Sequence, residues 1–264
     1  MTTQPPRTIG IIAAMPGEIA ALDTEIRAPG SGPKTNAHAP AITHARGNRE
    51  YHRGTIAGRD VVLVMSRVGK VAAATTATSL IHDHDPAEII FTGVAGGLAP
   101  AVAIGDVVIA TETLQHDLDA RPLFPQHEIP LLGLARIPAE PARVDHATVA
   151  ASAALHEINP NRTVHAGLIV SGDQFIASPA QRDPIIAAVP DALAVEMEGA
   201  AVAQVCHEHE VPWTIARLIS DAAGADAAAE FGIAIEDAAA RFSLAFVRDL
   251  LFSPEGAGES AVDR

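Results

Sequence analysis

Two carboxylates stand two positions apart in the segment Ala194-Val195-Glu196-Met197-Glu198-Gly199-Ala200-Ala201. They follow a short apolar run and precede small residues that favour the start of a helix. If the chain is still extended between them, Glu196 and Glu198 point to the same side, and if the helix has begun they diverge. Acidic groups in such a place are costly unless something binds them. The segment is therefore either a helix start, whose acids favour the positive end of the helix, or part of a binding site.

Other polar side chains stand near the ends of apolar runs. Glu18 follows the first apolar run of the chain, and Ser220 and Asp221 follow the last one. In open α/β sheets ligands bind beyond the carboxyl ends of the strands, so these groups are candidates for a shared site. An aspartate at a strand end can also be a plain cap for the next turn. Arg217 lies inside the last apolar run, where a buried guanidinium needs an acidic partner, and we expect Glu198 or Glu18 to supply it.

The segment Gly93-Val94-Ala95-Gly96-Gly97 follows another apolar run. Glycines at this place either let a ligand approach the backbone closely or form a plain tight turn. The spacing matches neither a phosphate-binding loop nor a dinucleotide fingerprint.

Two histidine-rich tracts, His82-Asp83-His84-Asp85 and His207-Glu208-His209-Glu210, look like metal-binding sequences. Both fall at expected helix ends, where alternate positions do not share a face, so we expect no metal site there. The single cysteine, Cys206, is expected to be a small buried residue and not a nucleophile. One cysteine also excludes an internal disulfide and fits a reducing cytoplasm.

The chain has 264 residues, of which 48% are hydrophobic and 19% charged, as is typical of a globular protein with room for a substantial core. Its net charge of −14 argues against nucleic acid and anionic membrane surfaces as partners. The first residues lack the apolar core of a signal peptide, and no apolar run is long enough to span a bilayer. We therefore expect a cytoplasmic protein.

Apolar runs and helix-forming segments alternate along the chain. Strands are expected at residues 8–14, 51–55, 61–65, 88–92, 107–110, 166–170, 193–195 and 214–219. Helices are expected at residues 18–27, 69–82, 144–156, 184–189, 199–209 and 235–251. This order predicts a single α/β domain over residues 1–252, built on a twisted, mixed or largely parallel central β-sheet flanked by helices. Residues 29–44 are expected to be a surface loop insertion, 119–141 a long irregular segment and 253–264 a disordered tail.

Six motifs occur in order along the chain, and together they carry a family resemblance. They are Ile11-Ile12-Ala13-Ala14-Met15-x-x-Glu18, Val68-Gly69-Lys70-Val71-Ala72-Ala73, Thr92-Gly93-Val94-Ala95-Gly96-Gly97-Leu98, Val170-Ser171-Gly172-Asp173-Gln174-Phe175-Ile176, Val195-Glu196-Met197-Glu198 and Arg217-x-Ile219-Ser220-Asp221. The ordered set resembles the bacterial 5′-methylthioadenosine/S-adenosylhomocysteine nucleosidases of the nucleoside phosphorylase superfamily. The resemblance implies one α/β domain, a homodimer, and hydrolysis of the N-ribosidic bond of these nucleosides and of 5′-deoxyadenosine, which releases adenine. It implies no metal and no cofactor.

The resemblance also implies roles for the residues that match the family's motifs. Glu18 would activate the attacking water, Asp221 would protonate purine N7, and Glu198 would bind the ribose hydroxyls. Met197 and Arg217 would lie near the sugar and the water, Phe175 and Ile176 at the adenine, and Met15, Val68 and Phe231 at the 5′-alkylthio group, with Glu196, Gly96 and Ser220 in the same site. Residues 119–130 of the partner subunit would complete the 5′ pocket.

The chemistry of such a reaction calls for these residue types. A purine leaves its sugar as a poor anion unless an acid protonates it, and a base must activate water on the opposite face of the sugar. Asp221 must therefore hold a proton near neutral pH, which burial or a hydrogen bond to the neutral form would allow.

Other functions stay open at this point. A phosphorylase of the same superfamily would use phosphate instead of water, but the strand Ile89-Ile90-Phe91-Thr92 lacks its phosphate-binding arginine, and Glu18 would repel phosphate. A non-catalytic purine-binding protein would keep Phe175 and Glu198 without needing both Glu18 and Asp221. A related hydrolase would act on another adenosine or a futalosine-like nucleoside. In each case Val94 stands where many family members have a serine, so a hydroxyl near the water is absent.

Overall fold

The computed structural model describes residues 7–28, 42–224, 226–227 and 233–252. Phe231 and the expected tail at 253–264 lie outside the described residues, as does most of the expected loop at 29–44. Every helix within the described ranges is too short or too polar to cross a lipid bilayer.

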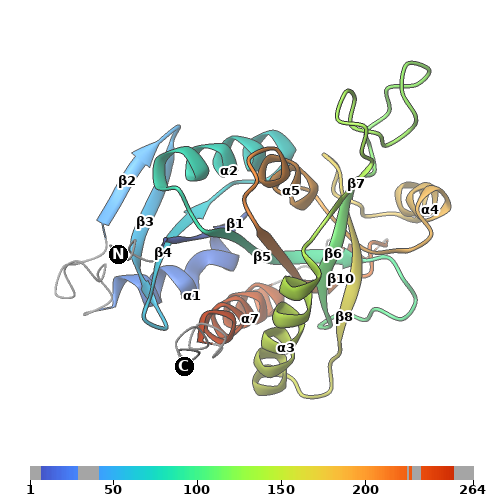
Figure 1. The fold of residues 1–264 in the computed structure, drawn as a ribbon. Helices are drawn as coiled ribbons and strands as arrows, with labels where there is room; N and C mark the ends of the chain where they lie inside the picture. Colours follow the sequence, from blue (N-terminus) through green and yellow to red (C-terminus); the bar gives the residue numbers. More distant parts are fainter. Residues whose placement is uncertain (1–6, 29–41, 225, 228–232, 253–264) are drawn as a thin grey trace, which may run out of the picture.

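A mixed sheet of ten strands runs through the described part of the chain (Figure 1). In chain order the strands are β1 (Ile9–Ala13), β2 (Ile42–Arg46), β3 (Arg49–Ile56), β4 (Arg59–Met65), β5 (Glu88–Gly97), β6 (Val107–Gln115), β7 (Arg136–Pro138), β8 (Val164–Ser171), β9 (Ala192–Glu196) and β10 (Trp213–Asp221). Their spatial order is β10-β6-β8-β9-β5-β1-β4-β3-β2, with β7 paired to β6. The inner strands β4, β1, β5 and β10 are parallel, whereas β2, β3 and β4 form antiparallel hairpins.

Five of these strands close into a ring. β5 pairs with β10, β10 with β6, β6 with β8 and β8 with β9, which leads back to β5. β5 changes neighbours along its length, because its first half pairs with β1 and its last residues, Gly96 and Gly97, pair with Val195 and Ala194 of β9. The ends of β1, β9 and β10 therefore meet around one strand.

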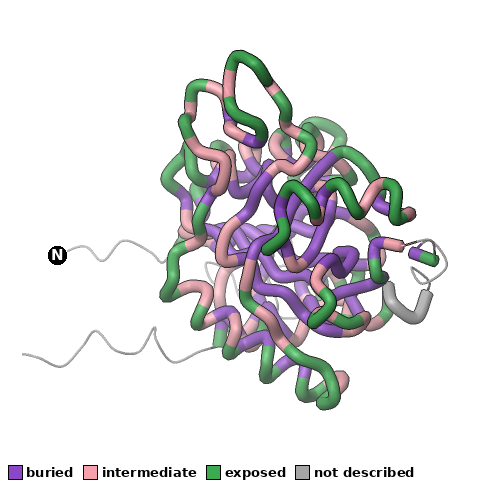
Figure 2. The backbone as a smooth tube through the Cα atoms, turned by 90° about the vertical axis from the view of Figure 1, so that its right-hand side faces the viewer, coloured by how far each residue is buried: buried purple, intermediate pink, exposed green. Residues whose placement is uncertain are grey.

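Helices cover both faces of the sheet. Figure 1 shows α1 (Pro16–Arg27), α3 (Pro141–Ile158) and α7 (Ile233–Phe252) on one face, α2 (Lys70–His84) and α5 (Gly199–Glu208) on the other, and α4 (Pro179–Ala188) at the side. Leu80 of α2 packs in one apolar layer with Ile12, and Leu22 of α1 and Phe246 of α7 pack in another with Ile11. Buried residues accordingly gather in the inner strands and on the inner helix faces (Figure 2). The expected fold class, a single α/β domain on a mixed sheet flanked by helices, is confirmed.

The composition of the central strands reflects burial on both faces. All residues of β1 and of β10 are buried. Largely apolar runs, interrupted in β10 by Arg217, and not polar–apolar alternation therefore mark these strands in the sequence. Pro16 and Pro141 begin α1 and α3 at the first helical position, where the missing amide hydrogen has no partner to lose.

Several expectations about local structure are wrong. The strand expected at residues 88–92 continues to Gly97 as β5, so of the two alternatives left open for residues 93–97 the tight turn is excluded. Residues 42–44 belong to β2 and not to a loop, because a tight hairpin turn with positive φ at Gly47 and Asn48 pairs β2 with β3. α4 begins at Pro179, which takes the first helical position that Pro184 was expected to have.

The segment between β6 and β7 stands out from the body of the domain (Figure 1). As expected it is irregular for most of its length, although β7 forms near its end and α3 begins at Pro141. Leu123 and Leu131 expose 82% and 93% of their surface, whereas Ile129 is buried. Exposed leucines on one projecting segment are typical of a surface that another molecule covers.

Candidate active site

A cavity of about 350 Å³ opens where β1, β9 and β10 meet β5, a volume usual for a small-molecule site. Ten of the residues expected from the sequence line it, namely Met15, Glu18, Val68, Gly96, Phe175, Glu196, Met197, Glu198, Ser220 and Asp221. Ile176 lines a small adjoining pocket, and Arg217 contacts the site through Glu196. Phe231 is outside the described residues. The structure thus brings together residues from six motifs that are far apart in the chain.

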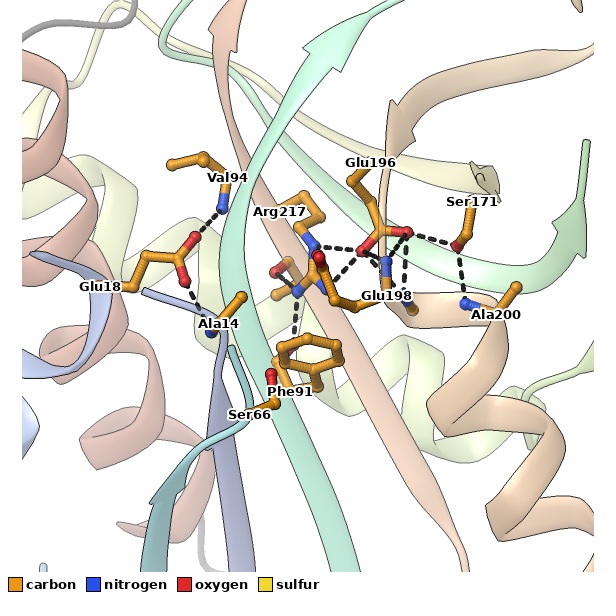
Figure 3. A network of polar contacts seen from close by, with 12 residues as sticks. Ala14, Glu18, Ser66, Phe91, Val94, Ser171, Glu196, Glu198, Ala200 and Arg217 are labelled. Carbon is orange, nitrogen blue, oxygen red and sulfur yellow. Dashed lines mark hydrogen bonds and ion pairs between the residues drawn. The ribbon is translucent and has the colours of Figure 1, made fainter. Parts of the chain in front are cut away.

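Backbone amides hold the carboxyl group of Glu18, which lies in the first turn of α1 (Figure 3). Its Oε2 accepts hydrogen bonds from the amides of Ala14 and Met15 at 2.8 and 2.9 Å, and its Oε1 accepts one from Val94 at 3.0 Å. The residue is only 3% exposed. Burial raises the pKa of Glu18, against the opposing effects of Arg217 and of the three amides. The result is a fixed carboxyl group that holds a proton more tightly than a surface glutamate does.

Two glycines of β5 leave room for acids. A side chain at Gly93 would place its Cβ 2.7 Å from Oε1 of Glu18, and one at Gly96 would place its Cβ 2.9 Å from Oδ1 of Asp221. Neither position has space for even a methyl group unless the acid moves. The glycine-rich segment is therefore a strand against which two carboxyl groups lie.

Asp221 is the last residue of β10 and is 2% exposed. Its Oδ1 accepts a hydrogen bond from the amide of Ala223, and its Oδ2 accepts one from the hydroxyl of Ser220, each at 2.8 Å. The amide bond is the local cap that an aspartate at a strand end can provide. Because Asp221 also lines the cavity, it combines this local contact with access to a ligand.

Arg217 is paired with Glu196, so the expectation of Glu198 or Glu18 as its partner is wrong. Nη2 of Arg217 lies 2.7 Å from Oε2 of Glu196, and both side chains are almost fully buried. The guanidinium also donates to the carbonyl of Phe91 and lies over the Phe91 ring, 4.0 Å from its centroid. Arg217 does not line the cavity itself, so it contributes to the site by holding Glu196, which does.

Glu196 also fixes the start of α5. Its carboxylate accepts hydrogen bonds from the amides of Glu198 and Gly199 at 2.8–3.2 Å and from the hydroxyl of Ser171. Ser171 in turn accepts a bond from the amide of Ala200. The first amides of a helix have no partner within it, and an acid satisfies them. Of the two acids in the opening motif, Glu196 is therefore the one that starts the helix.

Glu198 diverges from Glu196 and lines the cavity, because α5 begins directly after it at Gly199. Its Oε1 accepts a hydrogen bond from the amide of Gly69 at 2.6 Å. Burial, and after it the negative charge of Glu196, raises the pKa of Glu198 to about 8. The carboxyl group therefore holds a proton more readily than an ordinary glutamate does, and in its protonated form it can both donate and accept hydrogen bonds.

Apolar side chains form the rest of the cavity. Phe175 is 47% exposed and lies between the main cavity and the small adjoining pocket, where Ile176 is buried. Met15 and Val68 line another part of the main cavity. A half-exposed aromatic ring at the edge of an apolar cavity suits a flat ligand.

Sequence reasoning missed the groups that position the acids. The amides of Gly69 and Val94 each hold one acid, and Ser171 holds Glu196. Backbone amides carry no sequence signal, since every residue except proline has one. Ser171 did have a signal, because it ends an apolar run before Gly172-Asp173, much as Ser220 does before Asp221.

Cys206 and the histidine tracts do not line the cavity. Burial raises the pKa of the Cys206 thiol to about 12, which leaves it a poor nucleophile. His82 and His209 approach each other edge-on, with ring centroids 5.1 Å apart. In the part of the chain that the structure describes, no group of three or more His, Cys, Asp or Glu side chains is arranged to hold a metal ion.

Known proteins resemble this chain in sequence and in structure. The family model described as the phosphorylase superfamily matches residues 8–251. A 5′-methylthioadenosine/S-adenosylhomocysteine nucleosidase of Shewanella sp. (strain W3-18-1) is 38% identical over 223 residues, which cover 84% of this chain and 89% of that protein.

Two solved structures illustrate the likeness of the fold. The 5′-methylthioadenosine/S-adenosylhomocysteine nucleosidase from Neisseria meningitidis, in complex with methylthio-immucillin-A, has a TM-score of 0.81 and 33% identity over 93% of this chain and 99% of that one. The futalosine hydrolase of Helicobacter pylori strain 26695 has a TM-score of 0.79 and 29% identity over 93% of this chain and 97% of that one.

Proposed function

The chain belongs to the bacterial 5′-methylthioadenosine/S-adenosylhomocysteine nucleosidases of the phosphorylase superfamily, and we propose that it hydrolyses both of these nucleosides. It is thus an N-glycosidic bond hydrolase, and its products would be adenine and the thioribose. We include 5′-deoxyadenosine as a further substrate, because Met15 and Val68 make one part of the cavity apolar. The observation that carries the proposal is the placement of Glu18 and Asp221 in one cavity, against one strand.

Glu18 and Asp221 supply the base and the acid of the proposed reaction. They lie against Gly93 and Gly96, positions whose rise along β5 is on the order of 10 Å. Both acids line one cavity of about 350 Å³, and inverting glycoside hydrolysis requires two carboxyl groups with room for a sugar and a water between them. Glu18 takes a proton from the water that attacks the anomeric carbon. Asp221 gives a proton to purine N7 as the bond to the sugar breaks, so adenine leaves neutral.

The remaining lining residues bind the substrate in this proposal. Glu198 accepts a hydrogen bond from one ribose hydroxyl and donates one to the other. Donation requires a protonated carboxyl group, which the raised pKa of Glu198 favours. Phe175 stacks on adenine and Ile176 lies at its edge, while Met197 packs beside the sugar. The amide of Val94 donates to Glu18, so at this position the main chain helps to hold the base, although no side-chain hydroxyl is present.

Hydrolysis is favoured over phosphorolysis by the charge of the cavity. Its lining holds four acids, Glu18, Glu196, Glu198 and Asp221, and none of the described lining residues is Lys or Arg. Arg217 is already paired with Glu196. A phosphate dianion would therefore meet carboxyl groups and no cation, which is unfavourable in a buried site.

Adenine release is expected to proceed at the same rate with and without inorganic phosphate, and to yield the unphosphorylated sugar. The physical reason is the absence of a cation from the described lining. The measurement is adenine release from methylthioadenosine in phosphate-free buffer and in added phosphate, with the sugar product identified by mass. A sugar 1-phosphate would assign the chain to the phosphorylases instead.

Two other functions receive less support. A protein that only binds purines has no need for two separately positioned acids, yet both Glu18 and Asp221 are buried and held by several hydrogen bonds. The similarity to a futalosine hydrolase supports, as the second alternative, hydrolysis of a nucleoside with a larger 5′ substituent. A panel of adenine nucleosides and futalosine in the same assay distinguishes these cases.

Glu198→Ala is expected to reduce the preference for ribosides over 2′-deoxyribosides, while ribosides themselves react much more slowly. A buried carboxyl group that binds both hydroxyls loses one partner when a hydroxyl is missing, at a cost of roughly 1–3 kcal/mol. The ratio of kcat/KM for the riboside to that for its 2′-deoxy analogue therefore reports the contact. Glu198 would lose its role at the sugar if that ratio did not change.

Glu196→Gln is the control for this prediction. Glu196 is engaged with Arg217 and the first amides of α5, so its replacement should lower the melting temperature but change the riboside preference less. A shift in the preference as large as that of Glu198→Ala would place Glu196 at the sugar too.

We also propose that the chain is a homodimer, because exposed apolar side chains gather on the projecting segment. Leu123 and Leu131 lie there, and the expectation from the family is that residues 119–130 reach the partner's 5′ pocket. Sedimentation should give a dimer at assay concentration, and Leu123→Asp should shift it toward monomer and lower activity. Val149→Asp, an exposed position on α3, is the matched control and should do neither. A fully active monomer would overturn the proposal.

A further inference from the structure

A second cavity, of about 490 Å³, lies next to the first. It is lined by α1, by Asn48 in the turn between β2 and β3, by the first residues of β3, and by Met65 and Arg67 at the end of β4. Met15 lines the first cavity and Pro16 the second, and in the same way Val68 lines the first and Arg67 the second. No residue lines both cavities, so these two pairs of neighbours form the boundary between them, next to Met15 and Val68, where the 5′ group of the proposed substrates would lie.

The second cavity is charged, with both signs present. Arg49 and Asp23 line it, and each has a buried polar atom, Nε of Arg49 and Oδ1 of Asp23, with no hydrogen-bond partner among the described residues. Arg67, Glu50, Arg27 and His52 also line it, and Arg27 donates to the other oxygen of Asp23 at 2.7 Å. Buried polar atoms are normally satisfied, so an unpaired donor and an unpaired acceptor in one cavity call for a ligand that offers the reverse pair.

Arg67 stands in a backbone conformation that usually belongs to glycine. Its φ is 71°, and its guanidinium donates to the carbonyl of Asn48 at 2.5 Å. A long side chain is disfavoured at such a position, and strained residues of this kind cluster at ligand sites. Glycine would fit the backbone better, so what arginine adds here is a positive charge in the second cavity, beside the β2–β3 turn.

We propose that the second cavity binds the amino-acid end of S-adenosylhomocysteine, an inference that rests on the proposed nucleosidase function. Two methylene groups separate the sulfur of this substrate from a carbon that carries an ammonium and a carboxylate. Arg67 and Arg49 bind the carboxylate, and Asp23 and Glu50 bind the ammonium. Methylthioadenosine ends in a methyl group and leaves the second cavity unused. The charged residues therefore act on one of the two substrates only.

The test compares kcat/KM for S-adenosylhomocysteine and for methylthioadenosine in the full chain and in two variants, Arg67→Gly and Arg49→Gln. Arg67→Gly suits the backbone at positive φ, so it is expected to fold. In each variant the ratio of the two kcat/KM values should fall about tenfold against S-adenosylhomocysteine, as the loss of a charge-assisted hydrogen bond would produce. The matched control is Arg53→Gln. Arg53 belongs to the same strand as Arg49 but is outside the cavity lining, and its charge lowers the pKa of His84.

A third substrate, 5′-propylthioadenosine, has a tail without the charged groups. Its kcat/KM relative to methylthioadenosine should not change in either variant, which would show that charge and not tail length is recognised. An unchanged ratio for S-adenosylhomocysteine in both variants would overturn the charged subsite and leave the nucleosidase function intact. A wild-type chain that cleaves none of the three nucleosides would overturn the proposed function and the subsite together.

Discussion

Asp221→Asn is expected to lower kcat for methylthioadenosine by roughly 10²-fold or more, the usual effect of removing a positioned proton donor. Asparagine has nearly the same shape and still offers an oxygen to Ser220 or Ala223, so the fold should survive. It has no acidic proton for N7, and adenine would have to leave as an anion. Steady-state kinetics, with the melting temperature as a check on folding, measure the effect.

A riboside whose leaving group needs no protonation gives the control for Asp221. A 4-nitrophenyl riboside with a 5′-methylthio group releases a stable anion. If Asp221 acts on the purine, Asp221→Asn should lose little activity toward this substrate. Equal losses with both substrates would show that Asp221 serves a different step.

Glu18→Gln is expected to lower kcat by a similar factor, roughly 10² or more, but with both kinds of substrate. Water must attack whichever group leaves, and glutamine cannot accept a proton from it. The glutamine amide would also turn a donor toward the amides of Ala14, Met15 or Val94, which now donate to Glu18. The pair of variants and the pair of substrates thus separate base from acid. Activity within a few-fold of wild type in Glu18→Gln would remove Glu18 from its role.

The same assignment fixes the direction of the pH dependence. Burial raises the pKa of Glu18, and a base is active only above its pKa. The acid limb of kcat/KM should therefore lie at a higher pH than the value of about 4.3 for an unperturbed glutamate. Glu198, with a pKa of about 8, shares the cavity, so Glu198→Gln is the control that separates the two groups.

The sequence allowed the site to be assembled because its acids follow apolar runs. Glu18 comes soon after β1, Glu198 soon after β9, and Asp221 ends β10. Burial of a strand on both faces leaves an uninterrupted apolar run, and the first polar residue beyond it is then visible. All three acids line one cavity in the structure, as the positions of the runs indicated.

The pairing of buried charges could not be predicted in the same way. Arg217 was expected to pair with Glu198 or Glu18, but Glu196 is its partner. The choice depends on which strands are neighbours, and β5 pairs with β1, β9 and β10 at different places along its length. Such long-range pairings leave no local pattern. The same reason explains why a tight turn stayed open as an alternative for residues 93–97, since the acids that the glycines make room for lie elsewhere in the chain.

The glycines of β5 limit the ways in which this protein can be made more stable. Glycine weakens a strand, and a β-branched residue would be the ordinary replacement in a central strand. At Gly93 and Gly96 that route is closed, because the space beside the strand belongs to Glu18 and Asp221. A larger residue there would stabilise the strand but displace Glu18 or Asp221, which is a trade-off between stability and activity. Stabilising changes therefore have to come from the helical layers or the outer hairpins, away from the strand that carries the site.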